Sequence, residues 1–79
     1  MSDTETTITA DAAAHVLCLA GLGGYPAGSF IAKLLEAWVL ADSVNAAKLA
    51  QAFPAYGEAL ELLQETHGAA ALRAIAEEG

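Results

Sequence analysis

The chain has 79 residues and a formal net charge of −7 at pH 7, from ten acidic and three basic side chains. A chain of this length makes one domain, and its acidic balance excludes direct binding of nucleic acid or of an anionic membrane through a basic patch. The hydrophobic content of 56% is high for so small a domain. We therefore expect either helices that pack closely through their alanines or apolar surface that meets a partner.

Residues 1–8 are polar and rich in Ser and Thr, which predicts a flexible N-terminal tail followed by a single helical domain over residues 9–79. Thr9 is suited to cap a first helix, which we expect from about Ala10 to Leu22. The apolar run inside this helix is far shorter than the ~20 residues of a spanning helix, and the acidic start of the chain is unlike a signal peptide. We expect a cytoplasmic protein without membrane contact.

The first helix carries apolar residues on more than one side, and a helix of that kind is either buried centrally or shared with a second chain. We predict a homo-oligomer, most simply a two-fold dimer through this helix. The candidate self-association residues are Val16, Leu19 and Leu22. The alternative is full burial of this helix among the others.

Cys18 is the only cysteine, so the chain forms no internal disulfide and no cysteine-based metal cluster. We interpret Cys18 as a small buried hydrophobic residue and His15 as a hydrogen-bonded histidine at the edge of the core. His67 is too far along the chain to share a metal-ligand spacing with His15. No motif for a nucleophile, a phosphate or a dinucleotide occurs, so we expect no enzyme, no catalytic or metal residues and no cofactor.

The middle of the chain has the clearest helix start and stop signals. A second helix is expected to open at Ser29 as its N-cap, after the Tyr25-Pro26 step, and Asp42 is expected to cap a third. One broad buried face of the second helix is predicted to hold Phe30, Ile31, Leu34, Leu35, Trp38 and Val39. The residues that we interpret as structural are Pro26, Ser29, Trp38, Asp42, Phe53 and Pro54.

Pro54 is placed to stop the third helix and to begin a fourth, which we expect to reach Thr66. The apolar stripe of that helix is Tyr56, Ala59, Leu60, Leu63 and His67. A parallel acidic stripe and one leucine expected to be exposed beside it form a candidate partner surface: Glu58, Glu61, Leu62 and Glu65. The alternative for these glutamates is a solvated helix face.

Gly68 is expected to end the fourth helix as a left-handed cap, and Ala69 to Glu78 to form a last helix. The apolar side of that helix is Leu72, Ile75 and Ala76. Every periodic segment has the helical period and none alternates like a strand. The sequence therefore predicts an all-α fold, a compact bundle of four to five short helices.

Part of the chain, about residues 24–56, resembles small proteins of unknown function encoded by actinobacteriophages. A glycine-containing segment before a final apolar helix, here Gly68 to Ile75, is similar too. The residues that carry the resemblance are Gly24-x-Pro26-x-Gly28-Ser29-Phe30, Ala41-Asp42-x-x-Asn45 and Leu49-x-x-x-Phe53-Pro54. The resemblance implies no enzymatic activity; it implies a phage-encoded accessory protein in the cytoplasm of a host bacterium.

We expect a small acidic accessory protein that acts by protein–protein interaction, with a host cytoplasmic factor as its partner. Two alternatives remain open. One is a structural or assembly accessory of a virion, whose partner is a phage protein. The other is an acidic mimic of nucleic acid, which requires ordered carboxylates spread over one surface.

Overall fold

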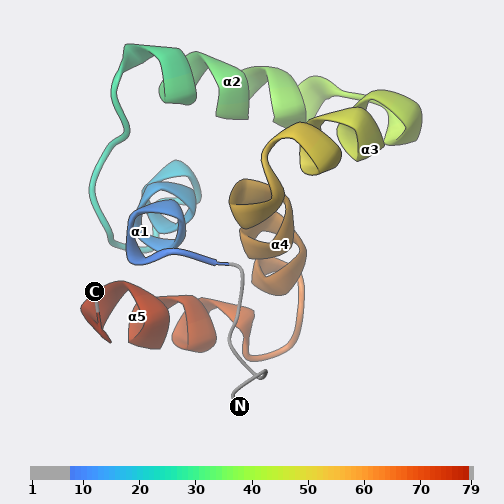
Figure 1. The fold of residues 1–79 in the computed structure, drawn as a ribbon. Coiled ribbons are helices and arrows are strands. Elements are labelled where there is room, and N and C mark those ends of the chain that lie inside the picture. The colour runs from blue at the N-terminus through green and yellow to red at the C-terminus, as the bar shows by residue number, and fades with distance from the viewer. Residues whose placement is uncertain (1–7, 79) are drawn as a thin grey trace.

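The computed structural model describes residues 8–78, and over this range the chain forms five α-helices and no strand. They are α1 (Ala10–Leu19), α2 (Ser29–Leu40), α3 (Ser43–Ala52), α4 (Pro54–Leu63) and α5 (Gly68–Glu78). Figure 1 shows α2 along the top and α5 along the bottom, with α1 and α4 between them. The predicted all-α bundle of short helices is confirmed. None of these helices has the length and apolar character that crossing a bilayer requires.

The start of α1 is held by a cap and by an apolar contact. Thr9 accepts a hydrogen bond from the backbone N–H of Ala12 at 3.0 Å, as predicted. Residues 1–7 of the expected tail lie outside the described residues. Ile8, however, is only 7% exposed and belongs to the core with Ala13, so assigning it to the tail was wrong. The two residues flank the cap at the positions of a hydrophobic staple, which fixes Ile8 against the first turns of α1.

The end of α1 comes three residues earlier than expected, at Leu19 rather than Leu22. Gly21 has a positive φ of 75°, and its N–H donates to the carbonyl of Cys18. The N–H of Leu22 donates to the carbonyl of Leu17 at 2.9 Å. These two bonds make a Schellman motif, in which a glycine adopts the left-handed conformation and closes the helix. Leu22 therefore lies in the α1–α2 loop, outside the helix.

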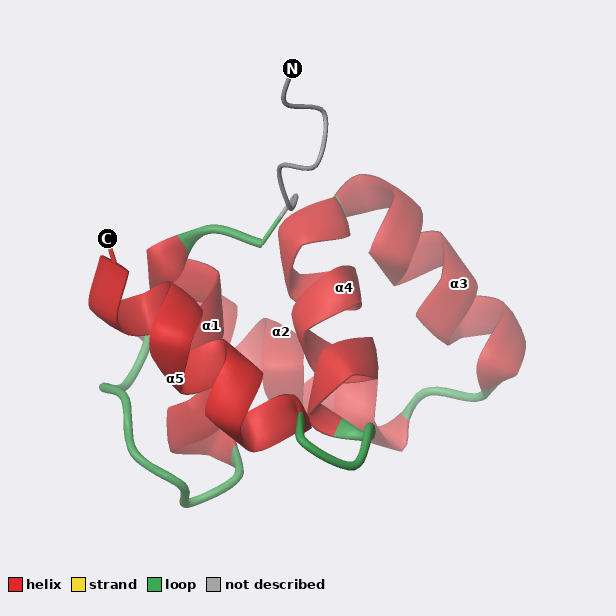
Figure 2. Ribbon diagram, turned by 90° about the horizontal axis from the view of Figure 1, so that it is seen from below, coloured by secondary structure: helices red, strands yellow, loops and turns green. Residues whose placement is uncertain are grey.

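The core lies where α1, α4 and α5 pack on one another (Figure 2). α1 contributes most of it, because its alanines let the neighbouring helices approach closely. The buried residues of the main cluster are Ile8, Ala12, Ala13, Val16, Leu17, Ala59 and Leu72. The middle of α1 is thus buried in the bundle, but Leu19 at its end is exposed, so the full burial that the sequence left open as the alternative holds only in part.

α2 lies more loosely on the bundle than its apolar pattern suggests. Leu35 and Trp38 are buried, but Phe30 and Val39 are 68% and 65% exposed, so the prediction of one broad buried face is wrong for these two. The reason is that only a narrow strip of α2 faces other helices. The N-cap also differs from the prediction, because Gly28 occupies that position without a side-chain hydrogen bond.

α3 stands beside α4 and buries none of its side chains. Asp42 caps it as predicted, accepting a hydrogen bond from the N–H of Asn45 at 2.8 Å. Phe53 is the C-cap of α3 and also the N-cap of α4. Pro54 is the first residue of α4, as expected. The ring of Phe53 lies 6.4 Å from that of Phe30, which is near the start of α2. This contact joins the outer ends of the two helices.

The connection between α4 and α5 differs from the prediction in two ways. α4 ends at Leu63, and Gly68 begins α5 without a positive φ, so it is not a left-handed cap. Gly68 is buried, and a Cβ there would overlap the carbonyl oxygen of Leu62. Leu62 itself is half-buried against the core rather than exposed, because α5 folds back under that side of α4. Leu72 of α5 is fully buried, as predicted.

Candidate interaction groove

Four helices enclose a groove with a volume of about 700 Å³. The last turns of α1, α2 and α4 contribute to it, and α3 lines one side with a row of alanines. The main apolar side chains in it are Leu19, Trp38, Val39, Ala46, Ala50 and Leu60. The groove is therefore apolar along most of its length.

The hollow follows from small residues and from loose packing of α2. Ala46, Ala47 and Ala50 recur at helical spacing, so α3 turns a smooth, shallow face toward the groove. α2 contacts α3 only lightly, which leaves the space between them open. α3 and α4 approach closely on the other side, since a Cβ at Gly57 would lie 2.9 Å from the Cβ of Ala50. This set of alanines is the part of the site that the sequence reasoning did not single out, and their spacing was the available signal.

The electrostatic character of the groove is negative. Helix C-termini carry partial negative charge of about −0.5 each, and α1, α2 and α4 all end at the groove. None of these three helices has a basic residue in its last turn to offset that charge. The carboxylate of Glu61 also lines the groove. The groove thus combines apolar walls with negative ends.

The basic residues of the chain lie elsewhere. Lys33 pairs with Glu36 at 3.7 Å on the exposed side of α2. Arg73 of α5 donates to the carbonyl of Leu22 at 2.8 and 3.3 Å, which ties the α1–α2 loop to α5. Lys48 is exposed on α3, and within residues 8–78 no Lys or Arg lines the groove. In the described part of the chain, no lysine or arginine side chain therefore neutralises the groove.

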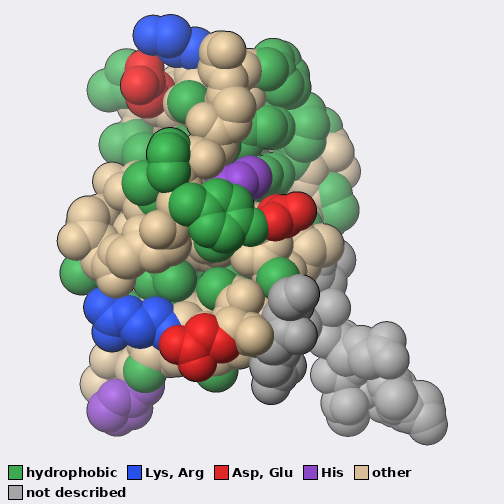
Figure 3. All heavy atoms as spheres, turned by 90° about the vertical axis from the view of Figure 1, so that its left-hand side faces the viewer, with side chains coloured by type: hydrophobic (Ala, Val, Ile, Leu, Met, Phe, Trp, Pro, Cys, Tyr) green, Lys and Arg blue, Asp and Glu red, His purple; other side chains and the backbone are tan. Residues whose placement is uncertain are grey.

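Large apolar side chains remain exposed around the same helices. Leu40 at the end of α2 is 86% exposed and Val44 at the start of α3 is 63% exposed. On another face, hydrophobic side chains cover the area of α2 and the loop before it (Figure 3). Tyr25 in that loop and Phe30 in α2 are both exposed. Exposed apolar side chains on a small chain make these two areas candidate interaction surfaces.

Apart from the groove, the structure contains a cluster of polar side chains around His15. Its ring stacks on that of Tyr56 and meets Tyr25 edge-on, and its Nδ1 lies 2.7 Å from the Tyr56 hydroxyl. The hydroxyl of Tyr25 donates a hydrogen bond to Asp11, which raises the pKa of Tyr25. Burial raises the pKa of Tyr56. The expectation of a hydrogen-bonded histidine at the core edge is confirmed.

This cluster borders a small cavity of about 110 Å³, lined in part by His15, Cys18 and Glu36. The thiol is partly buried, and the imidazole is already held by Tyr56. Within residues 8–78, no group of three or more His, Cys, Asp or Glu side chains is arranged to hold a metal ion. The expectation that the protein has no catalytic, cofactor or metal residues stays a prediction.

The structure separates the residues of the predicted self-association surface. Val16 is fully buried in the core, so it is removed from that surface. Leu19 and Leu22 are 38% and 39% exposed at the end of α1 and in the following loop. Both leucines therefore remain available to a partner, and Leu19 also lines the groove.

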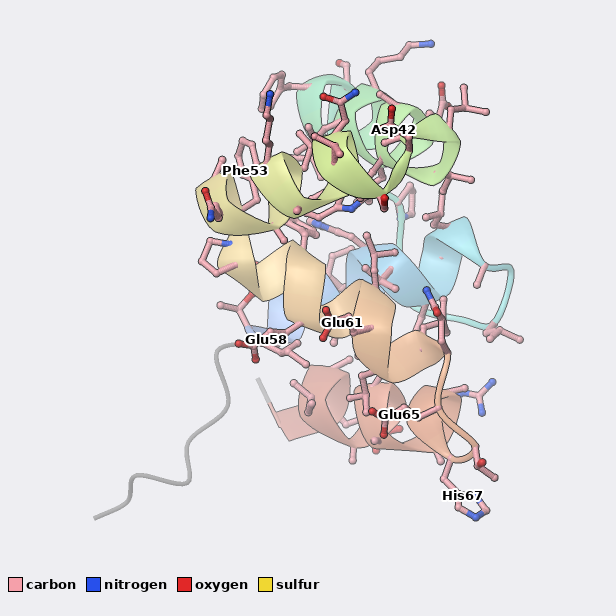
Figure 4. All side chains as sticks on the ribbon, turned by 90° about the vertical axis from the view of Figure 1, so that its right-hand side faces the viewer. Asp42, Phe53, Glu58, Glu61, Glu65 and His67 are labelled. Carbon is pink, nitrogen blue, oxygen red and sulfur yellow. The ribbon has the colours of Figure 1, made fainter. Side chains whose placement is uncertain are left out.

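The predicted acidic surface is partly retained. Figure 4 shows Glu58 and Glu61 on α4 and Glu65 beyond the end of that helix, and all three are exposed. His67 projects from the turn after α4, away from the other helices. Leu62 is half-buried against the core, which removes the apolar member of this candidate surface. Of the three glutamates, only Glu61 reaches the groove.

The residues that we interpreted as structural lie at helix ends, in the core or beside a cavity, and one of them differs from its predicted position. Trp38 is buried beside the groove, Asp42 caps α3, and Phe53 and Pro54 form the α3–α4 corner. Pro26 lines the small cavity next to His15. The exception is Ser29, which is the first residue of α2 and not its cap.

Comparison of this chain with protein families, with curated proteins and with solved structures finds no match.

Proposed function

We propose that this chain is a small accessory protein that acts by binding another protein through the groove and its exposed apolar neighbours. The observation that carries the proposal is the groove itself, an apolar hollow between four helices next to Val39, Leu40 and Val44, which are all strongly exposed. Hydrophobic surface that the chain does not cover by its own folding stabilises a complex when a partner covers it.

The resemblance to actinobacteriophage proteins supports a partner in the cytoplasm of an infected bacterium. A host factor is the first candidate. A virion structural or assembly protein is the second, and it would place the chain among the accessories of particle formation. Mimicry of nucleic acid is less favoured, because several carboxylates already serve local structure: Asp42 caps α3, Asp11 binds Tyr25 and Glu36 pairs with Lys33.

Self-association is a second candidate function, favoured by the partial exposure of Leu19 and Leu22. A symmetric contact would bring the same end of α1 from both chains together. The charge of −7 on each chain opposes this contact. The balance between the two effects depends on the salt concentration, because salt screens the repulsion between the two charged chains.

The test of the proposed function is affinity capture from an actinobacterial lysate, with and without phage infection. The wild-type chain should retain one protein in near-stoichiometric amount, and Val39→Ser combined with Leu40→Ser should lose it. A matched control, Ala70→Ser with Ala74→Ser, changes two exposed alanines of α5 and should retain the same protein. Retention by the groove variant, or no stoichiometric protein in any sample, would refute the proposal.

A further inference from the structure

We propose that the groove binds a cationic amphipathic helix of a different protein. This inference rests on the proposed function and names the chemical class of the partner. It is carried by three features of the described residues: the shape of the groove, the charge at its ends, and the charge of the chain as a whole.

The shape suits a short helix. The groove has one apolar wall from the alanines of α3 and another from Trp38 and Leu60, and it measures about 700 Å³. A helix of roughly 10 residues is ~15 Å long. The shortest dimension of this protein is 24 Å, so such a helix would lie within its span. A helix in an apolar groove places side chains at i, i+3, i+4 and i+7 against the walls, and the small residues of α3 leave room for leucine-sized groups there.

The charge selects a cationic partner. Three helices end at the groove without a basic residue in their last turns, and Glu61 adds a full negative charge. Lysine or arginine side chains flanking the apolar stripe of a bound helix would meet these carbonyl ends and this carboxylate. The same groove disfavours an acidic helix, because like charges in contact across an interface oppose binding.

A second copy of the chain fits less well. Each copy carries −7, and its only basic residues are Lys33, Lys48 and Arg73. Lys33 is paired with Glu36 and Arg73 is bound to a carbonyl, which leaves the exposed Lys48 as the basic side chain that a second copy could present to this groove. A small apolar molecule also fits the volume, since ligand sites commonly measure roughly 300–1,000 Å³. A small apolar molecule would leave the C-terminal ends of α1, α2 and α4 and the Glu61 carboxylate without a counter-charge.

The experiment uses three synthetic peptides of about 14 residues that contain no Trp or Tyr. The first has leucines at i, i+3, i+4 and i+7 with lysines around them. The second replaces each lysine by glutamate, and the third keeps the lysines but scrambles the leucines. Trp38 is the only tryptophan of the chain and lines the groove, so its fluorescence reports occupancy directly. The first peptide should bind and shift the Trp38 emission, and the other two should bind at least about tenfold more weakly.

Matched variants locate the binding site. Val39→Lys adds one positive charge at the groove, and Val44→Lys adds the same charge on a similarly exposed valine that does not line it. We expect Val39→Lys to weaken binding of the first peptide by roughly tenfold or more, and Val44→Lys to change it by less than about twofold. Glu61→Gln should weaken binding by about threefold, whereas Glu65→Gln, which does not line the groove, should have little effect. Circular dichroism checks that each variant stays folded.

Each other outcome overturns this inference. Equal binding of the cationic and the acidic peptide would show that charge does not select the partner. Equal binding of the scrambled peptide, or equal effects of Val39→Lys and Val44→Lys, would show non-specific attraction. Binding of a small hydrophobic dye in the groove without peptide binding would point to a small molecule, and dimerisation lost with Val39→Lys would point to a second copy. If lysate capture succeeds while no peptide binds, the inference fails and the proposed function stands; if both fail, both are wrong.

Discussion

At the scale of single residues, the polar side chains of this protein act mainly on nearby backbone and on each other. Thr9 and Asp42 cap α1 and α3 by accepting N–H groups that have no partner inside the helix. Beside α1, the Tyr56 hydroxyl is hydrogen-bonded to the ring of His15, and the Asp11 carboxylate accepts a hydrogen bond from Tyr25. Such contacts position helix ends, and each can be tested by a single substitution.

Asp42→Ala should lower the free energy of unfolding by about 0.5–2 kcal/mol, because the N–H of Asn45 loses its acceptor. Asp42→Ser should restore most of that loss, since serine also caps helices. Urea denaturation of the wild type and both variants measures the effect. If Asp42→Ala keeps full stability but loses the captured partner, Asp42 belongs to the binding surface and its structural role is secondary.

Because of Tyr25 and Tyr56, the free energy of unfolding should depend on pH in the alkaline range. The hydrogen bond to Asp11 chiefly raises the pKa of Tyr25, and burial chiefly raises that of Tyr56, both from 10.0. A pKa that is higher in the folded state contributes stability below the unfolded value, and this contribution is lost as pH rises through the folded pKa. The free energy of unfolding should therefore fall above pH 10.0.

Tyr25→Phe and Tyr56→Phe should each reduce this alkaline loss, because the substituted ring cannot ionise. All other residues are common to the three proteins, so the comparison isolates the substituted tyrosine. The measurement is urea denaturation at several values from neutral pH to beyond pH 10.0. Parallel pH profiles for the wild type and both variants would contradict this account of the tyrosines.

At the scale of helices, close approach through small residues decides which pairs pack. α3 has no buried side chain, yet it lies firmly on α4 because Gly57 faces Ala50. α2 has larger apolar residues but meets its neighbours along a strip that buries only Leu35 and Trp38. The helix with the smaller side chains is therefore the one that is more closely packed, and the groove opens beside it.

Gly57→Ala should destabilise the protein by about 1–3 kcal/mol, because the new methyl group would overlap Ala50 and push α3 away from α4. This loss should exceed the gain of up to about 1 kcal/mol from better helix propensity. The double variant Gly57→Ala with Ala50→Gly should be more stable than the sum of the two single changes, since the methyl group then moves from one helix to the other. Additive effects in thermal unfolding would show that the two positions are not in contact.

At the scale of the whole molecule, charge and apolar surface act against each other. The net charge of −7 repels a second copy, while Leu19, Leu22 and Leu40 present apolar surface that favours association. Salt screens the repulsion, with a Debye length of about 30 Å at 0.01 M and about 3 Å at 1 M. The hydrophobic contribution does not weaken with salt in the same way.

We therefore expect the average mass in sedimentation equilibrium to rise from that of a monomer at low salt toward that of a dimer at high salt. Leu19→Glu should keep the chain monomeric at both, and circular dichroism should show unchanged helix. A monomer at every salt concentration, at high micromolar protein, would remove self-association from consideration. A stable dimer already at low salt would show that the charge argument is wrong.

The sequence alone determined the helical class of the fold and where several helices begin. The helical period predicted the all-α fold, and Thr9, Asp42 and Pro54 marked helix starts that the structure confirms. Capping and the restriction before proline act within four residues, so neighbours along the chain suffice to predict them. The acidic charge, which repels nucleic acid and sets the kind of partner that we propose, is likewise a property of the sequence alone.

Only the tertiary structure decided which apolar residues are covered. The pattern of the sequence places Phe30 and Val39 on an apolar helix face and Leu62 outside one, yet the first two are exposed and the third is half-buried. Periodicity shows that a helix has an apolar face, but the width of the face that is buried depends on how many other helices pack against it. α4 meets α1, α3 and α5, whereas α2 meets its neighbours lightly, and this difference in packing is what opens the groove.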